Sequence, residues 1–381
     1  MSPKKIIHII PTLGGGGAEV LLGHIAIEQI KRGNEVHIII LEELHFTYTN
    51  YPIKKELENT VNLHLIEDKI KFSLKKRKFI NVTENINLLL QIINPDIIHS
   101  HLYLSEIYTH IQHVKNAKYI SHLHDNMFQF SFSKSKKLKQ NITNRLEVNW
   151  LKKQYIKSNT KFIAISEDTA NYFKKNLPKK IIENIHILPN ATNTNVYKPN
   201  FTVKNDFFKL VSVGNLVSKK NHEMLIDVMN YLVNNSKLKY HLDILGFGPL
   251  KEKLETKINS LGLNQFITLH GNVSNVSDFL SNSDLYVHTA KYEPFGMVFI
   301  EAMSSGLPIV STNGKGNSNL IINNFNGFLL EDFNFQKFAE RIDEICQNHE
   351  LRKKLSENSL NFSINFSIEQ YVEKLDEIYE I

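Results

Sequence analysis

The stretch that decides the fold spans residues 5–41 and reads KIIHIIPTLGGGGAEVLLGHIAIEQIKRGNEVHIIIL. The apolar runs at residues 5–11 and 36–41 predict two buried strands. Between them, four glycines lead into an amphipathic segment, residues 18–31, which predicts a helix that ends at Gly33 in a left-handed conformation. A strand, a helix and a second strand in this order build a parallel sheet with helices on both faces.

The same pattern recurs along the chain. Apolar runs predict strands at residues 96–99, 119–123 and 162–165, and a second series at 210–213, 241–245, 266–270, 284–288 and 308–311. An Asn-, Thr- and Pro-rich segment separates the two series and is typical of a linker. We therefore predict two doubly wound, Rossmann-like α/β domains, residues 1–190 and 209–364, joined by a linker at 191–208 and facing a cleft. A last amphipathic helix at 365–381 could pack on either domain.

The composition indicates a packed globular fold. Of 381 residues, 42% are hydrophobic and 22% are charged, close to globular averages. A single cysteine, Cys346, fits a reducing compartment. No apolar run approaches the roughly 18 residues of a membrane span, and the N-terminal apolar run is too short for a secretory signal. We expect a cytoplasmic protein.

Basic segments favour an anionic partner. The formal net charge is +6, and lysines and arginines gather at residues 71–78, 134–139 and 145–157. In the last segment Trp150, Leu151, Tyr155 and Ile156 alternate with lysines, as in helices that lie on membranes. A solvated helix face remains the alternative. Nucleic acid is not expected, because the chain has no zinc-finger, RNP-type or homeodomain pattern.

Two glutamates stand out in residues 291–308, KYEPFGMVFIEAMSSGLP. A helix is predicted to begin near Gly296, so that Glu293 lies just before it and Glu301 within it. The first amides of a helix lack intrahelical partners and attract anions such as phosphate. The amides concerned are those of Phe295, Gly296, Met297 and Val298. The two carboxylates would flank this phosphate site and could bind hydroxyl groups at either end of a ligand.

Several motifs in the right order resemble one family, the glycosyl transferases group 1 (GT4-like) enzymes of GT-B fold. EPFGMVFIEAMSSGLPIVST at 293–312 is similar to the family's E-x7-E signature, and GNLVSKKNHEMLI at 214–226 to its glycine-arginine…lysine segment. GGGGAE at 14–19, PDIIHSH at 95–101, LPN at 188–190 and NGFLL at 326–330, a late turn, resemble further family segments.

The resemblance implies a retaining hexosyltransferase of bacterial surface-polysaccharide or glycolipid assembly. It would use a nucleotide-diphosphate sugar, with a UDP-sugar favoured, and a sugar or lipid-linked acceptor, and it would need no metal or other cofactor. It implies that Glu293 binds the transferred sugar, Glu301 the ribose and Lys220 the diphosphate. It also implies that Gly16 and Gly17 approach the diphosphate, and it places His124 near the acceptor and the transferred sugar.

One departure keeps alternatives open. Asn215 replaces an arginine that the family usually has, which removes a charge from the diphosphate site. A non-catalytic nucleotide-sugar binder, or another GT-B enzyme such as a nucleotide-sugar epimerase, therefore stays an alternative. The glycine loop lacks a clear G-x-G-x-x-G pattern, which disfavours a nicotinamide enzyme. His99 and His101 are more simply structural, and no metal-binding motif is present.

Overall fold

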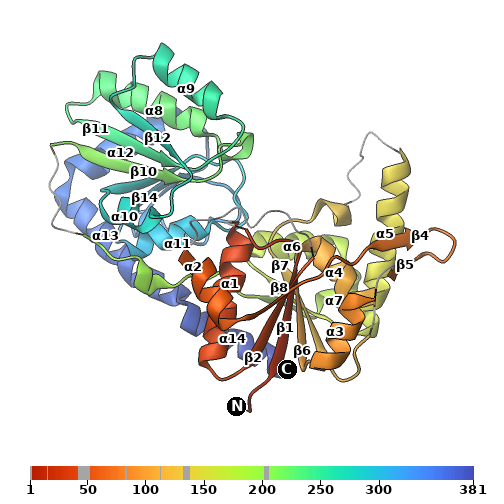
Figure 1. The fold of residues 1–381 in the computed structure, drawn as a ribbon. Coiled ribbons are helices and arrows are strands. Elements are labelled where there is room, and N and C mark those ends of the chain that lie inside the picture. Colours follow the sequence, from red (N-terminus) through yellow and green to blue (C-terminus); the bar gives the residue numbers. More distant parts are fainter. Residues whose placement is uncertain are drawn as a thin grey trace. The chain divides into compact units, whose positions relative to one another are not determined.

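The computed structural model describes residues 2–14, 16–41, 52–81, 84–111, 113–131, 138–200 and 206–381 (Figure 1). The chain divides into two units, the first comprising residues 1–190 and 368–381 and the second residues 191–367. Each unit has its own parallel sheet flanked by helices, which confirms the prediction of two Rossmann-like sheets.

The first unit contains a seven-stranded parallel sheet in the order β3-β2-β1-β6-β7-β8-β9. Strands β1 and β2 are buried except for their first residues, because helices cover both faces of the sheet. The short strands β3 and β9 were not predicted from the sequence, because neither contains a continuous apolar run. The strands are β1 (Lys5–Ile10), β2 (Glu35–Ile40), β3 (Asn62–Leu65), β6 (Ile97–His101), β7 (Lys118–Leu123), β8 (Lys161–Ala164) and β9 (Ile185–Ile187).

The helices of the first unit include one from the far end of the chain. They are α1 (Gly17–Lys31), α2 (Pro52–Thr60), α3 (Asn85–Ile93), α4 (Leu102–Ile111), α5 (Leu138–Lys157), α6 (Glu167–Asn176), α7 (Lys179–Ile182) and α14 (Ile368–Glu380), with a 3-10 turn, η1 (Phe128–Ser131). Gly33 follows α1 with φ of +88°, as predicted. Helix α14 packs beside α1 (Figure 1).

An antiparallel hairpin, β4 (Ile70–Ser73) and β5 (Lys78–Asn81), carries the first basic segment at its turn. Helix α5 packs against it through Trp150 and Phe79, whose ring centroids lie 5.0 Å apart. Trp150, Leu151 and Tyr155 belong to the core, and of the four predicted membrane-contacting residues only Ile156 is exposed. The interpretation of residues 145–157 as a membrane-surface helix is therefore wrong. The basic run 134–139 lies almost wholly outside the described residues.

The second unit contains a six-stranded parallel sheet in the order β12-β11-β10-β13-β14-β15. Its strands are β10 (Phe208–Val213), β11 (Tyr240–Leu245), β12 (Ile267–Gly271), β13 (Leu285–His288), β14 (Ile309–Thr312) and β15 (Gly327–Leu330). The NGFLL segment, expected as a turn, contributes four residues to the edge strand β15 instead. The helices are α8 (His222–Asn235), α9 (Lys251–Ser260), α10 (Val276–Ser281), α11 (Met297–Ser304), α12 (Phe335–Gln347) and α13 (His349–Ser363), with 3-10 turns η2 (Thr194–Val196), η3 (Ser218–Lys220) and η4 (Ile364–Phe366).

The strand order of the second unit reverses between β10 and β13. The chain adds β11 and β12 on one side of β10 and then crosses to β13 on the other side. In open parallel sheets, ligands bind outside the carboxyl ends of the strands at such a reversal. Here those ends are Val213 and His288, so the loops that follow them are the natural place for a site.

Part of the expected linker belongs to the second unit. The Thr192 amide donates a hydrogen bond to the Phe366 carbonyl, 3.1 Å away, so this strand-like segment is fixed to the end of the unit. Residues 201–205 lie outside the described part of the chain.

Candidate functional site

Helix α11 begins where the sequence predicted. Gly296 precedes its first residue with φ of +94°, a left-handed backbone conformation that residues other than glycine rarely adopt. A Cβ atom at Gly296 would also lie 2.4 Å from the Phe299 ring. Because Gly296 has no side chain to cap the helix, the amides of the first turn keep their capacity to bind an anion.

Glu293 is held in place by the loop that follows β14. Its amide donates to the Gly314 carbonyl at 2.9 Å, and its carbonyl accepts from the Gly316 amide at 3.0 Å. A Cβ at Gly316 would lie 1.8 Å from the Pro294 carbonyl oxygen, so this approach requires glycine. Sequence reasoning missed this loop, although the run NGKGN at 313–317, directly after a predicted strand, was the available signal.

Lys220 forms an ion pair with Glu293. Its Nζ donates to Glu293 Oε2, and the Nε2 atom of the buried His288 lies 3.2 Å from the same oxygen. Burial would raise the pKa of Glu293, but the His288 contact and the Lys220 charge outweigh it and lower that pKa to about 2. The site therefore holds an ionised carboxylate that is only 6% exposed. Sequence reasoning also missed His288, whose place at the end of β13 was the available signal.

The loops after β10 and β13 are tied together, which positions the ion pair. The Lys291 amide donates to the Lys219 carbonyl at 2.8 Å, and the Thr289 hydroxyl donates to the Asn221 carbonyl at 2.9 Å. These bonds bring the Lys220 segment to the strand end that leads to Glu293. Asn215, in the loop directly after β10, is exposed.

Glu301 is buried on α11, where its carboxyl group bonds to Tyr197. Burial outweighs that bond and raises the pKa of Glu301 to about 7. The two glutamates therefore differ in charge. At neutral pH Glu293 is ionised, whereas Glu301 is close to its titration midpoint.

The other predicted residues lie in the first unit. Gly16 and Gly17 are exposed at the start of α1, in the loop after β1. His124 directly follows β7 and is 7% exposed, and its Nε2 lies 2.9 Å from His101 Nδ1. His99 and His101 are fully buried. The cleft that would unite these residues with Glu293 stays a prediction.

Comparisons with known proteins identify the family. Residues 193–362 match the family model described as glycosyl transferases group 1, and residues 15–196 match the model described as glycosyltransferase family 4. Together the two models extend over nearly the whole chain. The chain belongs to the group 1 glycosyltransferases.

This glycosyltransferase is similar to two curated relatives and to one solved structure. It is 29% identical over 63% of its length to an uncharacterized glycosyltransferase of Methanocaldococcus jannaschii, covering 64% of that protein. It is 25% identical over 66% of its length to an Escherichia coli UDP-Gal:alpha-D-GlcNAc-diphosphoundecaprenol alpha-1,3-galactosyltransferase, covering 66% of that protein. The chain thus spans about two thirds of these relatives. Anabaena HepE, solved with UDP and glucose, has a TM-score of 0.78 at 19% identity, with 99% of each chain covered. This likeness shows the GT-B fold.

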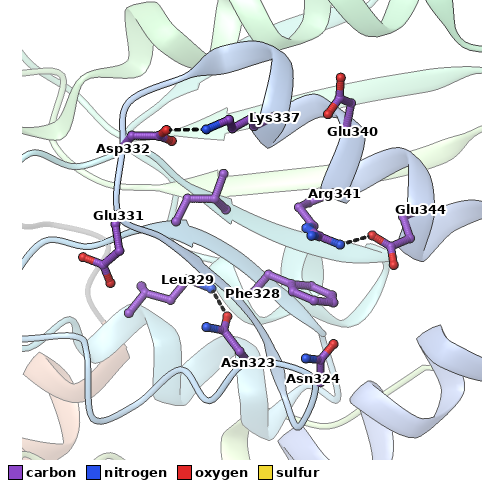
Figure 2. Close-up of a pocket in the computed structure, with 11 residues that line it drawn as sticks. Asn323, Asn324, Phe328, Leu329, Glu331, Asp332, Lys337, Glu340, Arg341 and Glu344 are labelled. Atoms are coloured by element: carbon purple, nitrogen blue, oxygen red, sulfur yellow. Dashed lines mark hydrogen bonds and ion pairs between the residues drawn. The ribbon is translucent and has the colours of Figure 1, made fainter.

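A hollow of the glycosyltransferase lies away from these residues. Its volume is about 720 Å³, and strand β15 and helix α12 supply most of its lining (Figure 2). Both of its basic groups are paired with carboxylates of the same lining, Lys337 with Asp332 and Arg341 with Glu344. None of the predicted donor-binding residues lines it, so we assign the site to the Glu293–Lys220 region.

In the described part of the glycosyltransferase, no helix has both the length and the apolar character needed to cross a membrane.

Proposed function

We propose that this glycosyltransferase moves a hexose from a nucleotide-diphosphate sugar, with a UDP-sugar favoured, to a hydroxyl group of a sugar or lipid-linked acceptor, with retention of anomeric configuration. The observation that carries the proposal is the ionised, buried Glu293, paired with Lys220 beside the uncapped start of α11. A fixed carboxylate binds sugar hydroxyls, whereas a lysine and helix amides bind a diphosphate. The acceptor class follows the Escherichia coli relative, whose acceptor is carried on diphosphoundecaprenol.

The donor would be held by groups that the second unit brings together. Glu293 accepts hydrogen bonds from hydroxyls of the transferred sugar, and Glu301 accepts them from the ribose. Lys220 and the amides of Met297 and Val298 meet the diphosphate. When a diphosphate arrives, Lys220 shares its charge between the phosphates and Glu293, so the carboxylate stays compensated.

In the proposed reaction, the acceptor hydroxyl oxygen forms a bond to the anomeric carbon while the bond from that carbon to the diphosphate oxygen breaks. The acceptor enters on the face that the diphosphate leaves, and a diphosphate oxygen takes the hydroxyl proton. Charge grows on the departing diphosphate, and Lys220 together with the α11 amides stabilises it as preorganised donors, without a metal. His124 contacts the acceptor or the transferred sugar.

Asn215 favours one alternative, a nucleotide-sugar binder without catalysis. An exposed amide in place of the family's arginine supplies no charge to the leaving diphosphate.

A thermal-shift screen of UDP-, GDP- and ADP-sugars identifies the donor, because a ligand at a hundred times its Kd stabilises the protein by about 2.7 kcal/mol. The chosen donor is then incubated with lipid-linked sugar acceptors in the presence of a chelator. Free nucleotide and a product with unchanged anomeric configuration are expected. Binding without nucleotide release would support the binder, and an altered free nucleotide-sugar would support an epimerase.

Donor affinity should rise with pH because of Glu301. The pKa of this carboxyl is about 7 in the free protein, and only the carboxylate accepts bonds from both ribose hydroxyls. About a tenth of the groups are ionised at pH 6 and nine tenths at pH 8, so affinity for the nucleotide-sugar should be about tenfold weaker at pH 6. Calorimetry measures this with the intact nucleotide-sugar, whose diphosphate does not titrate in that range. Glu301→Gln should bind equally at both pH values, and a wild type without pH dependence would refute the ribose role.

We propose that the hairpin turn binds anionic membranes. Leu74, Lys75, Lys76 and Arg77 are exposed there, on a hairpin anchored by the Trp150–Phe79 contact. Each basic residue near an anionic surface contributes about 1 kcal/mol, so replacing all three with glutamine should weaken vesicle binding about a hundredfold. Co-sedimentation with phosphatidylglycerol vesicles at low salt measures this.

The control for the hairpin variant removes the same charge elsewhere in the first unit, at the exposed Lys175, Lys179 and Lys180. This control should bind vesicles nearly as well as the wild type. Equal losses in both variants would mean that only net charge matters, and the hairpin would have no special role.

A further inference from the structure

Five buried histidines lie on one face of the first unit's sheet. They are His8 on β1, His99 and His101 on β6, His122 on β7 and His124 directly after β7. In the strand register His8 lies beside His99, and His101 lies beside His122. The proposed function uses only His124, so the other four rings call for a reason.

Three of these rings and one amide form a continuous chain of hydrogen bonds. Gln29, on α1, donates from Nε2 to the Tyr379 hydroxyl of α14 at 3.2 Å, and its Oε1 lies 2.8 Å from His8 Nε2. His8 Nδ1 lies 3.0 Å from His101 Nε2, and His101 Nδ1 lies 2.9 Å from His124 Nε2. This chain of hydrogen bonds runs from the helix layer to the carboxyl edge of the sheet. It ends at His124 Nδ1, which is buried and has no partner among the described residues.

The side-chain amide of Gln29 sets which nitrogen carries the proton on each ring of this hydrogen-bonded series. Each ring is neutral at pH 7, because burial lowers the pKa of His8 to about 4 and that of His124 to about 3, and burial with repulsion from neighbouring rings holds the pKa of His101 well below its ordinary value. A neutral imidazole donates from one nitrogen and accepts at the other. Since Gln29 Oε1 can only accept, His8 carries its proton on Nε2. His101 must then donate from Nε2, and His124 likewise, which leaves His124 Nδ1 bare.

A metal ion fits these rings less well than the hydrogen bonds do. Two triads have ring nitrogens within 4.8 Å of one another, His8–His99–His101 and His101–His122–His124. Both need His101, whose two nitrogens already bond to His8 and His124. A cation in either triad would have to break one of these bonds.

We infer that Gln29, His8 and His101 are positioning residues that hold His124 in its Nε2-protonated tautomer, so that the bare Nδ1 accepts a hydrogen bond from a substrate hydroxyl. The inference rests on the proposed function for the identity of that hydroxyl, on the acceptor or the transferred sugar. The tautomer itself does not depend on the proposed function. A histidine with its proton on Nδ1 would present a donor to the same hydroxyl and would orient it differently.

Nitrogen NMR of the full chain labelled with 15N-histidine tests the tautomers directly. Protonated and bare ring nitrogens differ in 15N chemical shift, and loss of a signal in His124→Asn, His101→Asn and His8→Asn assigns the rings. We expect Nε2–H with a bare Nδ1 for all three rings in the wild type. A proton on His124 Nδ1 would overturn the inference. So would a metal ion in the purified protein whose removal by chelator changes these signals.

Gln29→Leu tests whether the chain of hydrogen bonds fixes the tautomer of His124. His8 and His124 should then show both tautomers, and kcat should fall about tenfold while the donor KM stays unchanged. The matched control is Ser100→Ala, which removes buried hydrogen bonds to Glu106 and Ile120 on the opposite face of the same sheet. It should leave the tautomers unchanged. Unchanged tautomers in Gln29→Leu would overturn the inference, whereas absence of transfer by wild type would count against the proposed function alone.

Discussion

Glu293→Gln should lower the transfer rate about a thousandfold. The amide keeps the shape of the side chain but loses the charge that strengthens its bonds to the sugar hydroxyls. Each charge-assisted bond is worth about 1.5–3 kcal/mol, so losing two of them costs about 3–6 kcal/mol in the transition state. A coupled assay of nucleotide release with the donor identified by thermal shift measures this.

The control for Glu293→Gln is Glu340→Gln, which changes an exposed carboxylate of the same unit in the same way. It should keep wild-type activity. Circular dichroism should show both variants folded at the assay temperature. Wild-type turnover by a folded Glu293→Gln protein would remove the proposed role of this carboxylate.

Lys220→Ala should lower both stability and turnover. The substitution leaves Glu293, 6% exposed, without its cation, and an unpaired buried charge typically costs about 3–5 kcal/mol. For a unit of this size that lowers the thermal midpoint by roughly 10 °C. Turnover should fall more than donor affinity, because the lysine acts most strongly when charge grows on the departing diphosphate. Differential scanning fluorimetry and steady-state kinetics measure the two effects.

Lys219→Ala is the matched control for Lys220→Ala. Lys219 is the preceding residue, it is exposed, and its contact with the Lys291 amide uses its backbone carbonyl, which alanine retains. Its thermal midpoint and turnover should match those of the wild type. If both variants lost activity equally, the effect would reflect local basic charge and not the ion pair.

The pH at which stability is measured matters for the ion pair. The folded-state pKa of Glu293 is about 2, below the ordinary value of 4.5, so its stabilising contribution is present above pH 4.5 and is lost as pH falls toward 2. The Lys220→Ala comparison therefore belongs at neutral pH, where the wild-type pair is intact.

The fold was largely predictable because buried parallel strands are continuous apolar runs. The first strands of both units, β1 and β10, were found within three residues of their ends. Strand β3 lies at a sheet edge, is short and has no continuous apolar run, so it was not predicted. Strand β15 is also a short edge strand, and its apolar residues were interpreted as a turn. The membrane-surface interpretation of α5 failed because amphipathic spacing does not say whether lipid or protein covers the apolar face. Here the core covers Trp150.

The candidate site was predictable only where a motif fixes the local backbone. Gly296 and Glu293 follow from a helix start with its preceding turn, and both lie where expected. The pairing of Glu293 with Lys220 was not foreseen, because 73 residues separate them in the chain and only the sheet topology brings them together. The contact of the Gly316 loop with Glu293 and the hydrogen-bonded chain of histidines were missed for the same reason. Each depends on strand neighbours that a single sequence does not reveal.

One measurement tests the donor site most directly. Calorimetry compares the binding of a nucleotide-sugar and of the matching free nucleoside diphosphate to the wild type and to Glu293→Gln. If Glu293 holds the sugar, Glu293→Gln should bind the free nucleoside diphosphate at least as tightly as the wild type does, because Lys220 is no longer held by a carboxylate. The variant should also lose the additional affinity that the sugar gives to the nucleotide-sugar. A variant that binds the nucleotide-sugar as tightly as the wild type, or that loses affinity for both ligands equally, would contradict this account.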